Sequence, residues 1–467
     1  MPPLRIPSVS GTWNNQQIRI RPDRLVVSVR PGVRNPESIL AGIPHLIETH
    51  AHTPAIAVYT PGRRWAVFKF APLSASQILD LAGLIKASDQ RIRYVEPAII
   101  GELHLMPDNT PDYQLEWWPD TIHMPDAWDL TTGNNKVLLG IMDTGISMTG
   151  SSPDHPDLKD PPTRYIVRHG TVRHDYVIDD DIPRDEHYDG HGTHVAGIAS
   201  ADGNNGIGVA GVNWECPVYI ARVADACGSF GSDDLKNAVA DLLDYATGVY
   251  DRVVVNMSMG VAPEPEHLRE MCEDAASFAG KVLFVCAAGE NPADENNVAL
   301  DWPSAYAADF DFVVAVGGTY EDDTPCDPDR DNYDAITIFA PGNAIHSTMP
   351  TYARDPCTDK YGVVHPSGAT DYGDLGGTSM AAPMVAGVAS LMWTVNNGLS
   401  AADIIALLRS SARIIPYKMK VTDKVTGVVT EIWTSHYRLD AHPAVKNALP
   451  MVDLEEAHVL FADVAVG

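Results

Sequence analysis

Apolar and polar residues follow two different patterns along the chain. Between residues 23 and 98, strand-like apolar runs and two amphipathic segments succeed one another as strand, helix, strand, strand, helix, strand. The pieces are RLVVSVR, PESILAGIPHLIETH, AIAVYT, RWAVFKF, SASQILDLAGLIKAS and IRYVEPAII. This order predicts a small α+β unit, a split βαβ sandwich.

From residue 135 onward, short runs rich in Val, Ile and Leu alternate with helix-like segments. Near-continuous apolar runs separated by amphipathic helices predict an α/β fold with a doubly wound parallel sheet covered on both faces. Residues 319–376 are rich in Asp, Pro, Gly and Tyr and predict a long loop region. After it, an apolar helix is expected from Ser379 to about Val395. The expected strands are KVLLGIMD, CPVYIARVAD, RVVVNMSMG, KVLFVCAAG and FDFVVAVGG.

These patterns divide the chain into three parts. Residues 1–107 form an N-terminal segment and small domain, residues 108–448 form the large domain, and residues 449–467 form a C-terminal tail. The connector MPDNTPDYQ between the first two parts contains two prolines and has no periodicity, so we expect an exposed linker.

Charge is distributed unevenly over the 467 residues, whose formal net charge is −29. Residues 1–107 carry 12 Lys and Arg against 7 Asp and Glu, a net of +5, while the remainder has a net of −34. A basic front and an acidic body suggest two units that attract each other, although the acidic excess could equally serve only solubility. Because phosphate requires a basic face, nucleic-acid binding is disfavoured.

Neither a membrane span nor a secretory signal is expected from this sequence, because it contains no run of 18 consecutive apolar residues and no apolar region near its start. The protein is therefore expected to be cytoplasmic, or to be secreted after losing a signal that preceded this sequence. The six cysteines do not form an obvious disulfide framework. Cys326 and Cys357 both lie in a loop-rich region and could pair, but we expect no disulfide.

Candidate catalytic residues lie where strands end and helices begin. In an open parallel sheet, ligands meet the chain at the carboxyl ends of the strands. Asp143 ends one such strand, His191 begins a helix within DGHGTHVAG, and Ser379 begins another within GGTSMAAP. A hydroxyl, an imidazole and a carboxylate are the three groups that serine hydrolysis requires.

Each of these residues also has an ordinary structural interpretation. Serine is a common helix N-cap, histidine is often buried and hydrogen-bonded, and an aspartate before Thr-Gly can belong to a turn. Pro383 is expected in the first helical turn, where its missing N–H has no cost. Only the combination of the three sites favours catalysis.

The combination resembles the subtilisin family of serine endopeptidases. GIMDTGI is similar to that family's aspartate motif, DGHGTHVAG to its histidine motif and GGTSMAAPMVAG to its serine motif, in the same order along the chain. The resemblance extends from about Tyr113 to Leu449. It implies a hydrolase in which Ser379 attacks the substrate, His191 carries the proton and Asp143 orients His191.

The resemblance also implies a substrate site and a zymogen. The strand ends VVNMSMG and CAAGEN are similar to those that line the family's substrate cleft, which assigns polypeptide binding to Ser258, Met259, Gly260 and Gly289. The N-terminal domain is similar to the family's propeptides, which act as intramolecular chaperone and inhibitor. Self-cleavage is therefore expected between Gly101 and Tyr113.

One position departs from the family pattern. The family has Asn directly after AAG, where the side-chain amide donates to the oxyanion, whereas this chain has Glu290 there and Asn291 one place later. Either Asn291 points into the oxyanion hole, or Glu290 is held protonated and donates from its O–H. We favour Asn291, because an amide needs no change of pKa to donate.

Calcium is the one cofactor implied by the resemblance, and no organic cofactor is expected. The segment ADGNNGIGVAGV resembles the family's calcium loop. Carried over, the oxygen ligands are those of Gly203, Asn205, Ile207 and Val209, with Asp157 and Glu116 from elsewhere, a donor set that suits a hard cation. A plain glycine turn is the alternative.

Two other functions fit the same motifs. A peptide ligase or macrocyclase would use the same three catalytic residues but exclude water, and the 319–376 segment leaves room for a cover. A binding protein with a weakened active site is the third possibility, suggested by the altered oxyanion position.

Overall fold

The computed structural model describes residues 9–13, 16–58, 64–99, 112–158, 164–168, 174–178, 181–262, 264–278, 280–290, 300–326, 335–354, 356–358, 364–365, 370–422 and 429–450. Two compact units make up the chain, Met1–Leu103 and His104–Gly467, and each is described by itself.

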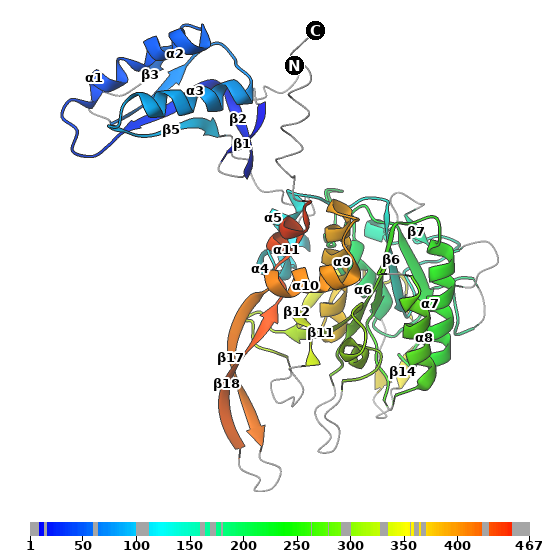
Figure 1. Ribbon diagram of the computed structural model, residues 1–467. Coiled ribbons are helices and arrows are strands. Elements are labelled where there is room, and N and C mark those ends of the chain that lie inside the picture. Colours follow the sequence, from blue (N-terminus) through cyan, green and yellow to red (C-terminus); the bar gives the residue numbers. More distant parts are fainter. Residues whose placement is uncertain are drawn as a thin grey trace. The chain divides into compact units, whose positions relative to one another are not determined.

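The first unit is an antiparallel sheet with helices packed on it (Figure 1). Its strands run in the order β1-β2-β4-β3. Strand β5 lies outside this order and also pairs with β2, between Ile20 and Val29. Leu25 and Val27 alternate along β2 into a core that also contains Phe68 of β4 and Ile78 of α3. Within residues 23–98 the order of elements agrees with the sequence pattern, except that the first predicted helix divides into two. Strand β1 was not predicted, and β2 begins earlier than expected. The elements are β1 (Val9–Trp13), β2 (Gln16–Val29), α1 (Pro36–Leu40), α2 (Ile43–Ala51), β3 (Ile56–Val58), β4 (Trp65–Lys69), α3 (Ala75–Ser88) and β5 (Ile92–Ile99).

The second unit is built on a nine-stranded sheet in the order β17-β18-β12-β11-β10-β9-β6-β8-β7. All neighbours from β18 to β7 are parallel, and only β17 and β18 pair antiparallel. This confirms the predicted α/β fold with a doubly wound parallel sheet. The strands are β6 (Val137–Asp143), β7 (Tyr165–Ile166), β8 (Val218–Arg222), β9 (Arg252–Met257), β10 (Val282–Ala287), β11 (Val313–Thr319), β12 (Ile338–Pro341), β17 (Arg413–Thr422) and β18 (Val429–Arg438).

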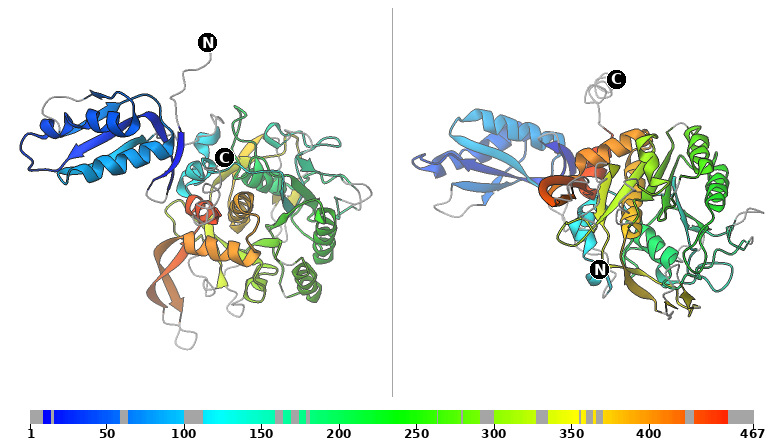
Figure 2. Two further views of the ribbon diagram at one scale, coloured as in Figure 1. Left: turned by 45° about the horizontal axis from the view of Figure 1, so that its top comes forward. Right: turned by 90° about the horizontal axis from the view of Figure 1, so that it is seen from below.

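Helices cover both faces of this sheet, with α7 and α8 on one side and α6 and α9 on the other (Figures 1 and 2). On β6, Gly140 faces α7 so closely that a Cβ there would lie 2.3 Å from Leu242 Cδ1. The helices are α4 (Trp118–Thr121), α5 (Met124–Trp128), α6 (His191–Ser200), α7 (Ser232–Ala246), α8 (Glu266–Ala276), α9 (Thr378–Val395), α10 (Ala401–Ser411) and α11 (Ala441–Ala448), with single 3₁₀ turns η1 (Asp112–Leu115), η2 (Pro156–Leu158) and η3 (Ser304–Ala308).

Helix α9 is the central helix of the second unit. Within the described residues it is the one helix whose length and mean hydropathy of 1.3 would allow it to cross a membrane, but 83 % of it is buried inside this unit. It therefore contributes to the core of the unit, and Met384, Val388 and Leu391 on it are fully buried.

The segment 319–376 differs from the long loop that the composition predicts. It contributes β12 to the large sheet and a second pair of strands, β13 (Ile345–Thr348) and β16 (Tyr372–Leu375), which are antiparallel. A short pair, β14 (Cys357–Thr358) and β15 (Val364–His365), lies between them. These strands have two to four residues each, and such short runs are too brief to show a period of two among many turn-forming residues.

Candidate active site

Asp143 and His191 form a hydrogen-bonded pair at the carboxyl end of the sheet. Asp143 is the last residue of β6 and is buried, and His191 is the first residue of α6. His191 Nδ1 lies 2.7 Å from Asp143 Oδ1. Because Asp143 occupies Nδ1, Nε2 is the ring nitrogen left for exchange of a proton with another group.

A buried carboxylate that the motifs did not reveal holds this pair in place. Asp185 accepts hydrogen bonds from Thr144 Oγ1 at 2.9 Å and from Thr193 N and Oγ1 at 2.9 and 2.6 Å. Thr144 Oγ1 in turn accepts from Gly192 N at 2.8 Å. The residues that follow Asp143 and His191 are thus joined through Asp185. In the sequence, Asp185 is one of three acidic residues in PRDEHYDG, and nothing distinguishes it from the other two.

The surroundings of His191 favour its charged form. Burial of the ring lowers its pKa, but the charge and hydrogen bond of Asp143 outweigh that effect, and the charges of Asp189 and Asp185 add to it. Together they raise the pKa of His191 to about 9. This arrangement stabilises an imidazolium, the form that a general base takes once it has accepted a proton.

Ser379 is not the helix cap that its sequence context allowed. The N-cap of α9 is Gly377, with φ 142°, and Ser379 is the second residue of the helix. Its Oγ donates to the Ser258 carbonyl oxygen at 3.2 Å, and among the described residues no hydrogen bond joins Ser379 to His191. The hydroxyl is therefore held by the end of β9.

Pro383 lies inside α9, not in its first turn as the sequence suggested. Because Pro383 has no N–H, the Ser379 carbonyl receives no helical hydrogen bond from the residue four places later. Ser258 Oγ donates to this carbonyl at 2.7 Å instead, and Asn256 Nδ2 donates to Ser258 Oγ at 3.0 Å. Ser258 thus exchanges two hydrogen bonds with Ser379.

Glu290 acts as a hydrogen-bond acceptor at the start of α9. Its Oε1 accepts from the Thr378 backbone N–H and, at 2.7 Å, from Thr378 Oγ1. Thr378 Oγ1 also accepts from Gly289 N at 3.1 Å. The carboxylate is therefore placed at the positive end of the helix that carries Ser379, where helix dipoles favour anions. Asn291 lies outside the described residues.

The residues predicted to bind substrate lie on two adjacent strand ends. Ser258, Met259 and Gly260 follow β9, and Gly289 follows β10. The two strands pair in parallel, with Met257 opposite Cys286, so that both ends reach the same edge of the sheet. Ser258 is buried, whereas the other three are partly exposed.

Two of the predicted calcium ligands, Asn205 and Val209, contact a third, Asp157. Asp157 accepts hydrogen bonds from Asn205 Nδ2 at 2.6 Å, Val209 N at 3.0 Å and Tyr372 Oη at 2.9 Å. Burial raises the pKa of Asp157 to about 6, although these hydrogen bonds oppose the shift. Gly203 and Ile207 belong to the same loop, which joins α6 to β8.

Glu116 approaches the same loop, where its Oε2 accepts from Ala210 N at 3.0 Å. Burial raises the pKa of Glu116 well above its usual value, and the nearby charge of Asp157 adds to the shift. Two buried carboxylates that destabilise each other fit a cation with oxygen ligands. Within the described parts of the chain, no three His, Cys, Asp or Glu side chains are grouped to hold a metal, so backbone and amide oxygens would have to complete such a site.

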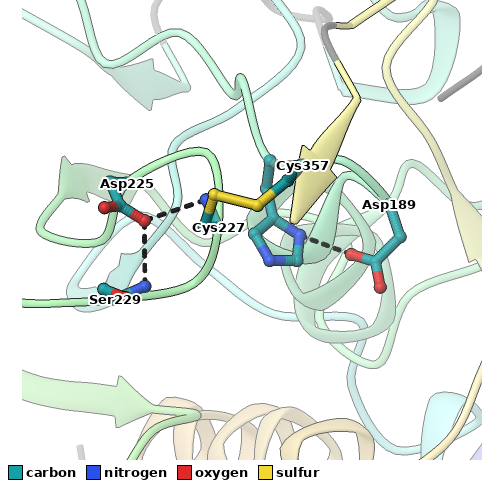
Figure 3. Close-up of a disulfide and its surroundings, with 6 residues drawn as sticks. Asp189, Asp225, Cys227, Ser229 and Cys357 are labelled. Atoms are coloured by element: carbon teal, nitrogen blue, oxygen red, sulfur yellow. Dashed lines mark hydrogen bonds and ion pairs between the residues drawn. A yellow bond between two sulfur atoms is a disulfide. The ribbon is translucent and has the colours of Figure 1, made fainter. Parts of the chain in front are cut away.

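The expectation of no disulfide is wrong, because Cys227 and Cys357 are bonded (Figure 3). Their Cα atoms are 5.6 Å apart, although 130 positions separate them in the sequence. Cys227 follows β8 in a turn where Asp225 Oδ1 accepts from the N–H groups of Cys227 and Ser229 (Figure 3). No spacing rule could pair them, since the pairing depends on which loops the fold brings together.

The disulfide lies close to the segment from His187 to His191. In the loop that contains Cys227, Gly228 approaches His187, whose Nε2 would lie 3.0 Å from a Cβ at that glycine. His187 Nδ1 lies 2.5 Å from Asp189 Oδ1, and the rings of His187 and His191 are 5.9 Å apart. The bond therefore fixes a loop that borders the neighbours of His191.

Replacing both Cys227 and Cys357 with serine is expected to lower the free energy of unfolding by about 2–4 kcal/mol, because a cross-link over so many residues restricts the unfolded chain. Urea unfolding of the Ser379→Ala background, with and without a thiol reductant, measures this. The reductant should destabilise the parent and leave the double variant unchanged. A parent that is equally stable with and without reductant would contradict the prediction.

Comparison with known proteins places this geometry in context. The sequence model of the Subtilase family, Peptidase_S8, matches residues 134–447. Thermitase from Thermoactinomyces vulgaris is 31 % identical over 335 residues, which cover 71 % of this chain and 96 % of thermitase. Halolysin from Haloferax mediterranei is 28 % identical over 409 residues, covering 83 % of this chain and 68 % of halolysin.

An intracellular relative and a solved structure are also similar. The major intracellular serine protease of Bacillus subtilis is 31 % identical over 299 residues, covering 62 % of this chain and 81 % of that protein. The crystal structure of a cold adapted subtilisin-like serine proteinase has a TM-score of 0.45 and 26 % sequence identity, covering 66 % of this chain and 89 % of that one.

Proposed function

The chain belongs to the subtilase family of serine proteases, and we propose that it hydrolyses polypeptides through Ser379, His191 and Asp143. Ser379 Oγ attacks the scissile carbonyl, and His191 Nε2 accepts its proton and passes it to the leaving amine. Asp143 holds the ring through Nδ1 and stabilises the imidazolium. The observation that carries this proposal is the 2.7 Å pair of His191 and Asp143 at the same edge of the sheet as the start of α9.

The first step requires a rotation of the Ser379 hydroxyl. In the structure it donates to the Ser258 carbonyl, whereas attack requires it to donate to His191. We propose that a rotation of the Ser379 χ1 angle between staggered positions makes this change. The bond from Ser258 Oγ to the Ser379 carbonyl keeps the backbone in place while the side chain turns.

Substrate is proposed to bind as an added strand beside Ser258, Met259 and Gly260. Strand addition uses backbone hydrogen bonds, so it accepts many sequences. Gly260 and Gly289 have no side chain on this edge, and Asp301 takes the space that a Cβ would occupy at each of them.

Two experiments test hydrolysis. A fluorophosphonate probe should label the wild-type chain at Ser379, and mass spectrometry of a defined peptide should show fragments whose summed mass exceeds that of the peptide by one water. Products without added water would indicate ligation, and absence of both labelling and products would refute the proposal.

The oxyanion is proposed to be held by the Ser379 N–H and the side-chain amide of Asn291. Glu290 supports this choice indirectly, since it already accepts two hydrogen bonds from Thr378 and thus has the role of an acceptor. Asn291→Ala is expected to lower kcat/KM by about 10²–10³, the effect of losing one oxyanion donor. Glu290→Gln should stay within about tenfold of wild type. The opposite ranking of the two variants in peptide assays would assign the donor to Glu290.

The first unit is proposed to be a propeptide that is cut from the second unit in the segment 101–113, most of which lies outside the described residues. The net charge of +5 on residues 1–107 and of −34 on the remainder supports electrostatic attraction after the cut.

Calcium is proposed to bind at Asp157, Glu116 and the oxygens of Gly203, Asn205, Ile207 and Val209. The ion would neutralise two buried carboxylates and so stabilise the loop. We expect removal of calcium by EGTA to lower the free energy of unfolding by about 2–3 kcal/mol relative to calcium at a hundredfold excess over Kd. Calorimetry of the Ser379→Ala chain measures this without self-digestion.

Two variants of one segment control the calcium experiment. Asp157→Asn should abolish the difference between calcium and EGTA. Asp154→Asn should retain it, because Asp154 accepts from Ser147 Oγ at 2.8 Å and is not a proposed ligand. Equal stability of the parent with calcium and with EGTA would contradict the site.

A further inference from the structure

A buried aspartate lies between the two strand ends that are proposed to bind substrate. Asp301 has 9 % of its surface exposed and precedes Trp302, which is fixed beside the end of β9. Val261 N donates to Trp302 O at 2.9 Å, and Trp302 N donates to Val261 O at 3.0 Å. This bridge holds Asp301 next to Gly260.

The side chain of Asp301 contacts both glycines. A Cβ on Gly260 would lie 2.5 Å from Asp301 Cβ, and a Cβ on Gly289 would lie 2.5 Å from Asp301 Oδ2. Real Cβ atoms do not approach other atoms so closely, so this position of Asp301 requires glycine on both strands. The side chain of Asp301 therefore fills the space that the two glycines leave beside the strand ends.

The same two strand ends are tied to the helix that carries Ser379. Gly289 N donates to Thr378 Oγ1 at 3.1 Å, one residue before Ser379. Ser258, which lies two residues before Gly260, donates from its Oγ to the Ser379 carbonyl at 2.7 Å. A substrate residue whose carbonyl is attacked by Ser379 would thus have its side chain near the two glycines, within reach of Asp301.

From this arrangement we propose that Asp301 determines specificity, by selecting polypeptides with Lys or Arg on the acyl side of the scissile bond. The proposal rests on the hydrolytic function proposed above and names its substrate class. A carboxylate with little access to water attracts a cation strongly. An apolar side chain placed against it is disfavoured, because the carboxylate would lose its remaining water without gaining a partner. The net charge of the body also draws cationic peptides toward it.

The selection has a consequence for maturation. Residues 101–113 contain neither Lys nor Arg. A cut in that segment would therefore use a poorly matched residue and should be slow compared with cleavage of a lysine peptide.

The test compares two p-nitroanilide peptides that differ only in the residue before the anilide, Lys in one and Leu in the other. Wild type should cleave the lysine peptide with a kcat/KM at least about tenfold higher, as expected for one added charge-assisted hydrogen bond. In Asp301→Asn, kcat/KM for the lysine peptide should fall about 10- to 100-fold, and that for the leucine peptide should stay within about threefold. The concentration of active sites is set by fluorophosphonate titration.

Asp309→Asn is the matched control, because it removes one negative charge at the surface, where Asp309 pairs with Arg269 at 2.8 Å. It should leave the ratio of the two peptides unchanged. A wild-type chain that prefers the leucine peptide overturns the inference while the hydrolytic function stands, and this comparison tests the substrate class even where Asp301→Asn does not fold. A chain that cleaves neither peptide and takes up no probe overturns both.

Discussion

Replacing Ser379 with alanine should lower kcat by about 10⁶, the magnitude that loss of the nucleophile has in subtilisin. In the proposed mechanism no other group forms the acyl-enzyme, because His191 and Asp143 are assigned only to moving and stabilising a proton. The variant should also accumulate as an uncut chain of 467 residues. Steady-state peptide cleavage and intact-mass measurement after incubation with calcium record the two effects.

Ser390→Ala is a suitable control, since Ser390 lies on the same helix but is buried away from the site. Its Oγ donates to Gly387 O at 2.6 Å and accepts from Asn213 Nδ2 at 2.7 Å. We expect this variant to lose stability and to keep its kcat. If Ser379→Ala still cleaved peptides at one hundredth of the wild-type rate, on the order of 10⁴ times more than expected, a different nucleophile would have to be sought.

The motifs allowed the edge of the sheet to be predicted in some detail. Continuous apolar runs predicted β6, β9 and β10. Asp143, which ends β6, could be identified because it is the first charged residue after an unbroken apolar run. The helix that carries Ser379 was expected to run to about Val395, where α9 ends. Local pattern was sufficient here because each element is long and nearly uniform in composition.

Contacts between distant segments could not be predicted in the same way. Nothing near Cys227 distinguishes Cys357 from Cys326 as its partner, and nothing near Asp301 indicates that Gly260 and Gly289 meet its side chain. The position of Pro383 inside α9 differs from the prediction for a related reason. The sequence places no limit on where the helix begins, whereas the structure starts it at Thr378 and satisfies the Ser379 carbonyl with Ser258.

The hairpin of β17 and β18 shows the same limit. A single residue pair, Phe339 and Arg438, joins it to β12, while Trp433 on β18 is 71 % exposed. Strand β17 directly follows α10, and no change in amino-acid composition there indicates that the hairpin lies at the edge of the sheet. Which strands lie at an edge is a property of the whole sheet and not of any one segment.

Asp143→Asn should lower kcat/KM by about 10⁴, because an amide can hold His191 in the tautomer that carries its proton on Nε2 and cannot stabilise the imidazolium. The pH dependence should change as well. His191 acts as a base only when neutral, so the wild-type kcat/KM should rise with pH until it levels off above the raised pKa of about 9. Loss of the Asp143 charge lowers that pKa, so the rise should move to lower pH. A pH–rate profile of each protein with one peptide measures both effects.

Asp189→Asn separates the role of Asp143 from a general effect of charge. Asp189 also helps to raise the pKa of His191, but its Oδ1 is hydrogen-bonded to His187, at 2.5 Å. Its variant should shift the profile slightly to lower pH and keep kcat/KM within about tenfold of wild type, since the tautomer of His191 is unaffected. Equal losses in the two variants would mean that Asp143 acts only through its charge. A loss below tenfold in Asp143→Asn would remove it from the proton relay, because holding the ring through Nδ1 is the one contact that distinguishes it from its acidic neighbours.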